Sequence, residues 1–287
     1  MKTVTGIPGM KALTAEWRAA GKTIGFVPTM GYLHEGHLSL VRESRRRCGA
    51  TVVSIFVNPA QFGPSEDLQR YPRDLAKDSA MLEREGVDVL FVPAAEAVYP
   101  PGYKTYVEVR DLQDRLCGRT RPGHFRGVAT VVLKLFNIVR PHVAFFGAKD
   151  AQQTVIIEKM ARDLDLDVEI AVCPIVREPD GLAMSSRNVY LSPDERAAAR
   201  VLSKSLTEAE RLIREGERDA SRIVGRMKDT IAGEPLARLD YAEIVEAESL
   251  EPVVEVRGGT LILLAVYIGR TRLIDNLRVR IEEISSC

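Results

Sequence analysis

Short apolar runs and longer amphipathic segments alternate along the first part of the chain. The predicted strands cover residues 23–27, 51–57 and 87–92, and the predicted helices between them cover residues 34–47 and 74–85. Residues 51–57 are apolar except for Thr51 and Ser54, which is typical of a parallel strand that is covered on both faces. Such an alternation favours an α/β fold with a doubly wound parallel sheet.

The pattern changes after residue 176. Before it, we predict further helices at 10–20, 127–139 and 150–164, and further strands at 103–109, 143–146 and 168–172. After it come a polar loop at 177–192, helices at 193–217 and 219–231, and strands at 239–245, 253–256, 260–267 and 272–277, two of them joined across Gly258 and Gly259. We therefore expect two domains, residues 1–176 with the parallel sheet and residues 177–287 with a smaller α+β fold.

Charge and cysteine content indicate which binding partners and which cellular compartment fit the chain. The 287 residues contain 40 basic and 40 acidic side chains, so no global field favours nucleic acid or an anionic membrane. The four cysteines are scattered without a CxxC pair, which indicates reduced thiols. The longest apolar run, residues 261–267, is too short to span a bilayer. We expect a cytoplasmic protein without nucleic-acid or membrane partners.

Two histidines follow the strand predicted at 23–27. Pro28 and Gly31 predict a turn, and His34 and His37 would share one face of the next helix. In an open parallel sheet, a nucleotide is expected where a strand ends beside a helix N-terminus. The spacing does not fit a zinc protease, which requires HExxH. The alternative is a pair of capping or surface histidines.

A second polar loop, residues 58–63, follows the next strand and reaches the same edge of the sheet. Asn58 and Gln61 are uncharged groups that both donate and accept hydrogen bonds. They suit a substrate with hydroxyls and a carboxylate. An Asn-Pro turn with a solvated glutamine is the alternative.

A third loop, residues 147–153, again leads from a strand through a glycine into a helix. Lys149 is a cation suited to a phosphate. Asp150 caps the helix, orients Lys149 or binds a ribose hydroxyl, and these alternatives stay open. Gln153 lies one turn into the helix and can face the same cleft.

Residues 180–188 lie in the polar loop between the two predicted domains. Ser185, Ser186 and Arg187 could clamp a triphosphate, because hydroxyls bond to its oxygens and a guanidinium neutralises charge in the transition state. A polar linker is the alternative. The loop 119–127 contains Arg121 and His124, and either a charged surface or a basic rim for an anionic substrate fits it.

Together these motifs resemble the pantothenate synthetase (pantoate–β-alanine ligase) family, within the HIGH/KMSKS nucleotidyltransferase superfamily. The resemblance covers nearly the whole chain and is looser in the C-terminal domain. Residues 34–37 and 184–187 correspond to the two superfamily signatures, and residues 28–31, 58–63 and 147–153 match as well. It implies a Rossmann-like sheet with a smaller C-terminal α+β domain. We expect that domain to act as a lid that hinges at residues 177–192.

The resemblance implies an ATP-dependent ligase of pantothenate and coenzyme A biosynthesis. The carboxylate of (R)-pantoate attacks the α-phosphorus of ATP to give pantoyl adenylate and pyrophosphate, and the amine of β-alanine then displaces AMP. Since a carboxylate is already a nucleophile, such an enzyme must chiefly hold two anions together and stabilise charge on the phosphates. The resemblance also implies Mg2+ that travels with ATP, and a homodimer. The protein ligands of the metal stay unknown, with Asp78 a speculative helper.

Site roles follow from the resemblance residue by residue. It implies catalytic roles for His37, His34, Lys149, Ser185, Ser186 and Arg187. It implies an ATP site lined by Met30, Gly31, Tyr32, Leu33, His34, Glu35, Gly36, His37, Gly147, Ala148, Lys149, Asp150, Val176, Met184, Ser185, Ser186 and Arg187. It implies substrate binding by Gln61, Gln153 and Asn58.

Three rival interpretations remain. An adenylyltransferase with another substrate would keep the same motifs, and a truncated aminoacyl-tRNA synthetase would lack its anticodon-binding part and its basic tRNA surface. A nucleotide-sensing protein would keep the fold without catalysis. Exchange of pyrophosphate into ATP separates them, because only an enzyme that adenylates pantoate needs pantoate for exchange.

Overall fold

The computed structural model describes residues 1–64 and 66–280, which separate into two compact units. The first unit contains residues 1–148 and 153–176, and the second contains residues 149–152 together with those from Arg177 onward. Residues 149–152 therefore group with the second unit, although the sequence pattern places them in the first domain.

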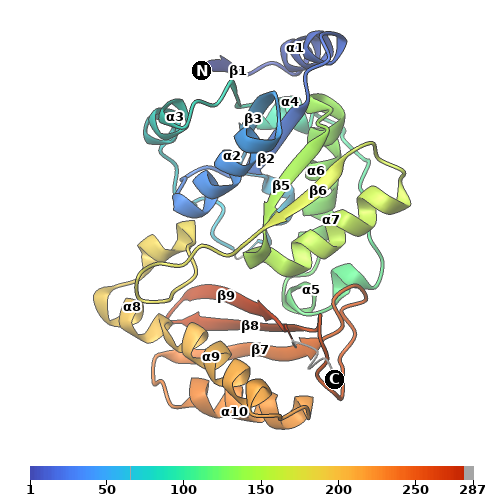
Figure 1. Cartoon of the computed structure of the whole chain (residues 1–287). Helices are drawn as coiled ribbons and strands as arrows, with labels where there is room; N and C mark the ends of the chain where they lie inside the picture. Colours follow the sequence, from blue (N-terminus) through green and yellow to red (C-terminus); the bar gives the residue numbers. More distant parts are fainter. Residues whose placement is uncertain (65, 281–287) are drawn as a thin grey trace. The chain divides into compact units, whose positions relative to one another are not determined.

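Six parallel strands form the sheet of the first unit, in the order β1-β4-β3-β2-β5-β6 (Figure 1). They are β1 (Lys2–Val4), β2 (Ile24–Thr29), β3 (Ala50–Ile55), β4 (Val89–Phe91), β5 (Val143–Gly147) and β6 (Glu169–Cys173). The chain winds outward from β2 through β3 to β4, and in the other direction from β5 to β6. The predicted doubly wound sheet is confirmed, and its order reverses between β2 and β5. Ligands bind outside the carboxyl ends of the strands at such a switch point.

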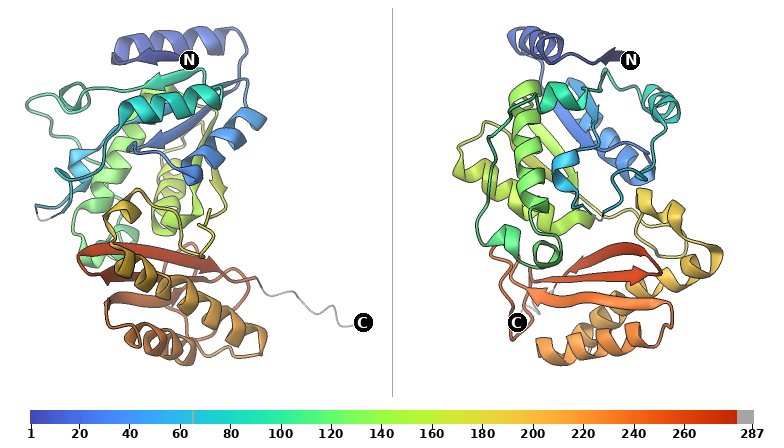
Figure 2. Two further views of the ribbon diagram at one scale, coloured as in Figure 1. Left: turned by 90° about the vertical axis from the view of Figure 1, so that its left-hand side faces the viewer. Right: turned by 180° about the vertical axis from the view of Figure 1, so that it is seen from behind.

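Helices cover both faces of this sheet (Figure 2). The helices along this part of the chain are α1 (Ile7–Ala19), α2 (Glu35–Arg47), α3 (Leu75–Arg84), α4 (Ala95–Val98), α5 (Cys117–Thr120), α6 (His124–Val139) and α7 (Ala151–Asp163). Successive strand residues point to opposite faces. Val27 and Phe145 pack with residues of α2 and α3, whereas the rings of Phe26 and Phe146 lie 6.5 and 6.4 Å from that of Phe136 on α6.

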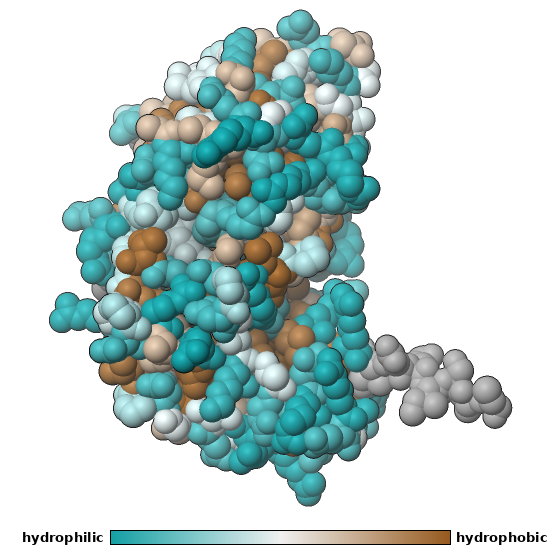
Figure 3. Space-filling model, turned by 60° about the vertical axis from the view of Figure 1, so that its left-hand side comes forward, coloured by the Kyte–Doolittle hydropathy of each residue, from teal (hydrophilic) through white to brown (hydrophobic). Residues whose placement is uncertain are grey.

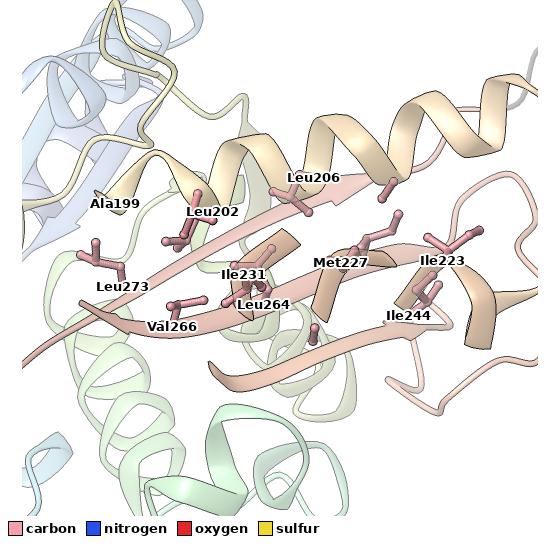
Figure 4. Close-up of a cluster of buried hydrophobic side chains, with 14 of the residues drawn as sticks. Ala199, Leu202, Leu206, Ile223, Met227, Ile231, Ile244, Leu264, Val266 and Leu273 are labelled. Atoms are coloured by element: carbon pink, nitrogen blue, oxygen red, sulfur yellow. The ribbon is translucent and has the colours of Figure 1, made fainter. Parts of the chain in front are cut away.

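The second unit is an antiparallel sheet with helices on one face (Figure 4). Its strands are β7 (Ala237–Val245), β8 (Leu261–Ile268) and β9 (Thr271–Arg278), and its helices are α8 (Pro193–Ala199), α9 (Val201–Arg214) and α10 (Ala220–Ala232). Leu202 and Leu206 of α9 and Ile223 and Met227 of α10 are buried in one cluster with Leu264 of β8. This smaller α+β unit agrees with the prediction.

The strand predicted at residues 103–109 is absent from the described structure. Val107 N–H donates to Thr130 Oγ1 at 2.9 Å and Val109 N–H donates to Gln113 Oε1 at 3.2 Å, so side chains satisfy backbone groups that a strand would pair. The Tyr103 ring stacks on that of Tyr99, and Lys134 Nζ of α6 lies 4.4 Å above it.

Three predictions in the second unit also need correction. The predicted strand at residues 253–256 is absent from the part of the chain that the structure describes: Glu255 forms an isolated bridge with Asp219, and the preceding Pro252, which has no N–H to continue a ladder, forms one with Val245. The turn between paired strands falls at Gly269 rather than at 258–259. The helix predicted at 193–217 is divided at Arg200, whose Nε donates to Ala197 O at 3.2 Å. In the first unit, β1 was not predicted, because a strand of only three residues leaves no periodic pattern.

Polar side chains predominate on the face of the molecule in Figure 3. Within the described ranges, no helix is long and apolar enough to cross a membrane. Cys48, Cys117 and Cys173 are free thiols, and Cys287 lies outside the described residues.

Candidate active site

The turn after β2 is built on a left-handed backbone. Gly31 and Tyr32 have φ values of 83° and 51°, and a Cβ on Gly31 would lie 2.9 Å from the Ile55 side chain. Thr29 Oγ1 donates to Ser54 O at 2.7 Å and accepts from Gly31 N–H at 3.2 Å. Only glycine fits the first position without strain, and the threonine ties the turn to β3.

Asp78 of α3 holds the same turn from the other side. Its two carboxylate oxygens accept the N–H groups of Tyr32 and Leu33, each at 2.7 Å, and the side chain is almost fully buried. Burial raises the pKa of this carboxyl above its usual value, against the opposing effect of the two hydrogen bonds. A cavity of about 300 Å³ opens beside the turn, with Met30 and Arg73 among its lining residues.

His34 and His37 cap the N-terminus of α2 together. His34 Nδ1 accepts Gly36 N–H at 3.2 Å, and His37 Nδ1 accepts His34 N–H at 3.3 Å. The two half-buried rings lie 4.1 Å apart. Because both Nδ1 atoms accept, each neutral ring carries its proton on Nε2. Capping and ligand binding are therefore compatible: the cap fixes the rings at the electropositive end of a helix.

The glutamine predicted to bind substrate lies in a short 3-10 helix, η1 (Pro59–Gln61), after β3. Asn58 Nδ2 donates to Gln61 Oε1 at 3.0 Å and to Gly127 O at 3.1 Å. Asn58 Oδ1 accepts Ala60 N–H at 3.3 Å and the Tyr99 hydroxyl at 2.8 Å. All four hydrogen-bonding positions of the Asn58 amide are thus used within the protein.

Arg121 and His124 support the same loop. Arg121 pairs with both oxygens of Glu66, at 2.7 and 2.6 Å, and lies 3.0 Å from His124 Nε2. His124 Nδ1 lies 2.8 Å from Gln61 O. Burial opposes ionisation of Glu66, but the hydrogen bonds from Arg121 prevail and lower the pKa of that carboxyl. Both basic residues therefore have structural partners in the loop that carries Gln61.

The loop after β5 divides between the two units. Gly147, Ala148 and Gln153 belong to the first unit, as does Val176. Lys149 belongs to the second unit, where its backbone carbonyl accepts from Asn276 Nδ2 of β9 at 2.8 Å. Lys149 Nζ lies 3.7 Å from Asp150 Oδ1, so the neighbouring carboxylate can orient the ammonium group.

In the second unit, residues 184–187 lead into the 3-10 helix η4 (Ser186–Tyr190). Ser185 caps it by accepting Arg187 N–H at 3.3 Å, and Ser186 is buried. Asn188 Nδ2 donates to Glu178 Oε1 at 2.9 Å and to Ala183 O at 3.2 Å. Side-chain hydrogen bonds therefore hold this segment in place, unlike the polar linker that was the alternative interpretation of its sequence.

Residues 177–183 are anchored to the same unit. Arg177 makes two hydrogen bonds to Asp275 of β9, at 2.7 and 2.9 Å, and one to Gly181 O at 3.0 Å. Arg196 bonds to Glu178 at 2.9 Å and to Asp180 at 3.0 Å. The hydrogen bond from Arg196 is the main reason that the pKa of Glu178 is lowered. These contacts leave little freedom for a hinge spread over residues 177–192.

A metal site made by the protein alone does not fit the observed side chains. Within residues 1–64 and 66–280, no group of three or more His, Cys, Asp or Glu is placed to hold an ion. The two oxygens of Asp78 already accept backbone N–H groups, which argues against its role as a magnesium ligand.

Sequence reasoning missed several supporting residues, namely Tyr99, Gly127, Asp275 and Asn276. Each acts on a segment distant in the chain, and no local pattern marks Tyr99, Asp275 or Asn276. Gly127 carried the one usable signal, a glycine in an apolar helix: a Cβ there would lie 2.2 Å from Ala60 O.

The chain matches the family model described as pantoate-beta-alanine ligase over residues 2–278. It is 58% identical to the pantothenate synthetase of Acetivibrio thermocellus over 281 residues, 98% of this chain and 100% of that protein. It is 57% identical to the pantothenate synthetase of Thermotoga petrophila over 276 residues, 96% of this chain and 99% of that one.

Solved structures show the same similarity. Pantothenate synthetase from Thermus thermophilus superposes with a TM-score of 0.91 at 46% identity, covering 98% of this chain and 100% of that one. Pantoate-beta-alanine ligase from Francisella tularensis, complexed with beta-gamma ATP and beta-alanine, has a TM-score of 0.80 at 34% identity, with 97% of each chain covered.

Proposed function

The chain belongs to the pantoate–β-alanine ligase family, and we propose how its residues carry out the reaction of that family. It catalyses the ATP-dependent condensation of pantoate with β-alanine to pantothenate. We propose two steps, adenylation of the pantoate carboxylate with release of pyrophosphate, then attack of the β-alanine amine on the acyl carbon with release of AMP.

The observation that carries the site proposal is the histidine pair at the N-terminus of α2. His34 and His37 direct Nε2–H donors from the electropositive end of a helix, beside the switch point between β2 and β5. Such donors suit the phosphate oxygens on which negative charge builds during adenylation. We propose that His37 stabilises that charge and that His34 assists it.

Other phosphate contacts are proposed for Lys149, Ser185, Ser186 and Arg187. Asn276 and Asp150 hold the backbone and the ammonium group of Lys149, and the cap of η4 orders the residues around Ser185. Ordered cations and hydroxyls need less reorganisation when charge develops, which supports this assignment. We propose further that the ATP site is completed by residues 30–37, Gly147 to Asp150, Val176 and Met184.

Gln61 and Gln153 are the proposed pantoate-binding side chains. Gln61 follows β3, the neighbour of β2, and its Nε2 lies 3.2 Å from Met30 Sδ in the turn after β2. Amides suit the hydroxyls and carboxylate of pantoate. Asn58 supports Gln61, as its four internal hydrogen bonds indicate.

Three properties of the working enzyme are also proposals. Mg2+ would accompany ATP and be held mainly by phosphates, since the described residues offer no acidic cluster. A homodimer follows from the family resemblance, and light scattering of the purified protein tests it. A cytoplasmic site of action is supported by the free thiols Cys48, Cys117 and Cys173.

We propose that the second unit closes over bound ATP as a lid. Because Arg177 is anchored to Asp275, the bending would fall near residues 148–153 and 176–177 rather than across 177–192. Solution scattering that is identical with and without ATP plus pantoate would contradict this motion.

Exchange of labelled pyrophosphate into ATP tests the function. We expect exchange that depends on pantoate in the wild-type protein. His37→Ala and Lys149→Ala should fold normally and lose exchange by about a hundredfold or more, on the order of what removing one transition-state donor costs. Lys159→Ala is the matched control, since Lys159 pairs with Asp163 on the exposed side of α7.

Each result separates the candidates. Exchange with another acid but not with pantoate would indicate a related adenylyltransferase, and ATP binding without exchange would indicate a sensor. Near wild-type exchange by His37→Ala or Lys149→Ala would show that the role proposed for that residue is wrong.

A further inference from the structure

Tyr99, which lies just after α4, is joined to the proposed pantoate site through one intermediate side chain. Its hydroxyl donates to Asn58 Oδ1 at 2.8 Å, and Asn58 Nδ2 donates to Gln61 Oε1 at 3.0 Å. Asn58 is 1% exposed and Gln61 is 9% exposed. In such a buried series of hydrogen bonds, the orientation of each side-chain amide depends on that of its neighbour.

Two backbone groups set the direction of this chain. Ala60 N–H can only donate, so the Asn58 atom 3.3 Å from it must be oxygen. Gly127 C=O can only accept, so the Asn58 atom 3.1 Å from it must be nitrogen. These two contacts fix which end of the Asn58 amide is oxygen and which is nitrogen. Because the nitrogen faces Gln61, the Gln61 atom that accepts from it must be Oε1.

The orientation of the Gln61 amide follows from that of Asn58. Its oxygen faces Asn58, and its NH2 group points toward Met30 Sδ, 3.2 Å away, beside the turn after β2. Gln61 therefore presents hydrogen-bond donors to a ligand. This matches a substrate oxygen, from a carboxylate or a hydroxyl, rather than a substrate amine.

Tyr99 is itself held firmly as a donor. Its ring packs at 6.3 Å from Phe56 and 5.1 Å from Tyr103, and Lys134 Nζ lies 5.7 Å above the Tyr99 ring and 4.4 Å above the Tyr103 ring. Burial, together with the neighbouring tyrosines, raises the pKa of Tyr99, so its hydroxyl keeps its proton at neutral pH. These contacts keep the Tyr99 hydroxyl directed at Asn58.

We propose that Tyr99 is a positioning residue, which acts through Asn58 to hold the Gln61 amide with its NH2 group toward an oxygen atom of pantoate. This inference rests on the proposed binding of pantoate by Gln61. Tyr99 itself touches no substrate. Its hydroxyl donates to the second lone pair of Asn58 Oδ1 and thereby limits rotation of the Asn58 and Gln61 amides.

The test compares Tyr99→Phe with Tyr103→Phe in the full-length enzyme. Both substitutions remove one hydroxyl from the same stack of tyrosines, but only Tyr99 bonds to Asn58. We expect Tyr99→Phe to raise the KM for pantoate about fivefold, the factor that one net hydrogen bond of this kind is worth, with the KM for ATP unchanged. Tyr103→Phe should leave both values unchanged.

A combined variant separates positioning from a general effect on the fold. If Tyr99 acts through Gln61, adding Tyr99→Phe to Gln61→Ala should change kcat/KM for pantoate no further. If Tyr99→Phe lowered kcat/KM for pantoate by the same factor in the wild-type and Gln61→Ala proteins, the proposal would be overturned. So would an equal rise in the KM values for ATP and pantoate with a lowered melting temperature, since that pattern denotes a structural role alone.

Gln61→Glu tests the amide polarity without touching Tyr99. It keeps an oxygen facing Asn58 and replaces the proposed donor by a second oxygen, so we expect a larger rise in the KM for pantoate than Tyr99→Phe causes. An unchanged KM would overturn the inferred direction. Pyrophosphate exchange by the wild-type protein, measured in parallel, separates the two hypotheses. If that exchange does not depend on pantoate, the proposed function fails. If it does, but Tyr99→Phe and Tyr103→Phe behave alike, only the positioning role is refuted.

Discussion

Replacing Asp78 by asparagine should impair catalysis and cost little stability. In the native protein, both carboxylate oxygens accept backbone N–H groups at 2.7 Å, from Tyr32 and Leu33. Asparagine can accept only one of them and turns its NH2 group toward the other. A buried donor left unsatisfied costs about 1–3 kcal/mol.

An opposing effect reduces that loss of stability. Burial raises the pKa of Asp78, which means that the ionised carboxylate is costly to bury. A neutral amide avoids this cost, so we expect the free energy of unfolding to fall by only about 0–2 kcal/mol. The turn itself should not survive intact, because Tyr32 keeps its φ of 51° only while both N–H groups are held.

Catalysis depends on that turn because it leads directly into the histidine cap of α2. We expect pyrophosphate exchange by Asp78→Asn to fall at least about tenfold, since displacements of about 1 Å in a reacting group already cost that much. Asp74→Asn is the control. It alters the exposed N-cap of the same helix, where Asp74 accepts Lys77 N–H at 3.0 Å and asparagine caps about equally well. If Asp78→Asn exchanged pyrophosphate as fast as Asp74→Asn, the turn would not position the histidines.

Two further predictions concern stability. His142 Nδ1 accepts Ile24 N–H at 2.9 Å, and burial, followed by the charge of Arg18, lowers its pKa below the usual 6.5. The neutral imidazole therefore contributes stability that is complete above pH 6.5 and is lost as the pH falls through the lowered pKa. His142→Asn, which keeps an acceptor, should remove this part of the pH dependence of urea unfolding, and an equal slope in both proteins would contradict it. Gly127→Ala should lower the free energy of unfolding by about 2–4 kcal/mol because its Cβ would lie 2.2 Å from Ala60 O, whereas Gly225→Ala, with open space around its Cβ, should raise it by about 0.5–1 kcal/mol in α10. Thermal unfolding of the two alanine variants measures both changes, and a stable Gly127→Ala protein would mean that α6 and η1 can separate at little cost.

Much of the fold was predictable because its determinants are local. The apolar strand at residues 51–57 and the start of a helix at Pro193 both reflect backbone preferences and burial patterns that act over a few residues. Failures came where the partner was distant. Residues 103–109 have a strand-like pattern, yet Thr130, which is 23 positions beyond Val107, supplies a partner that a neighbouring strand would have provided.

For the site, residue type and order along the chain establish which chemical groups are available and on which loops they lie. Strand ends in a parallel sheet share one edge, so His34, His37 and Gln61 could be assigned to it from order along the chain alone. The orientation of those groups, in contrast, depends on contacts that form when the chain folds. The rings are fixed by a mutual cap, the turn by Asp78 and the Gln61 amide by Asn58 and Tyr99. Hydrogen-bond direction depends on which donor meets which acceptor in space, and residues 41 to 46 positions apart meet only after the chain has folded.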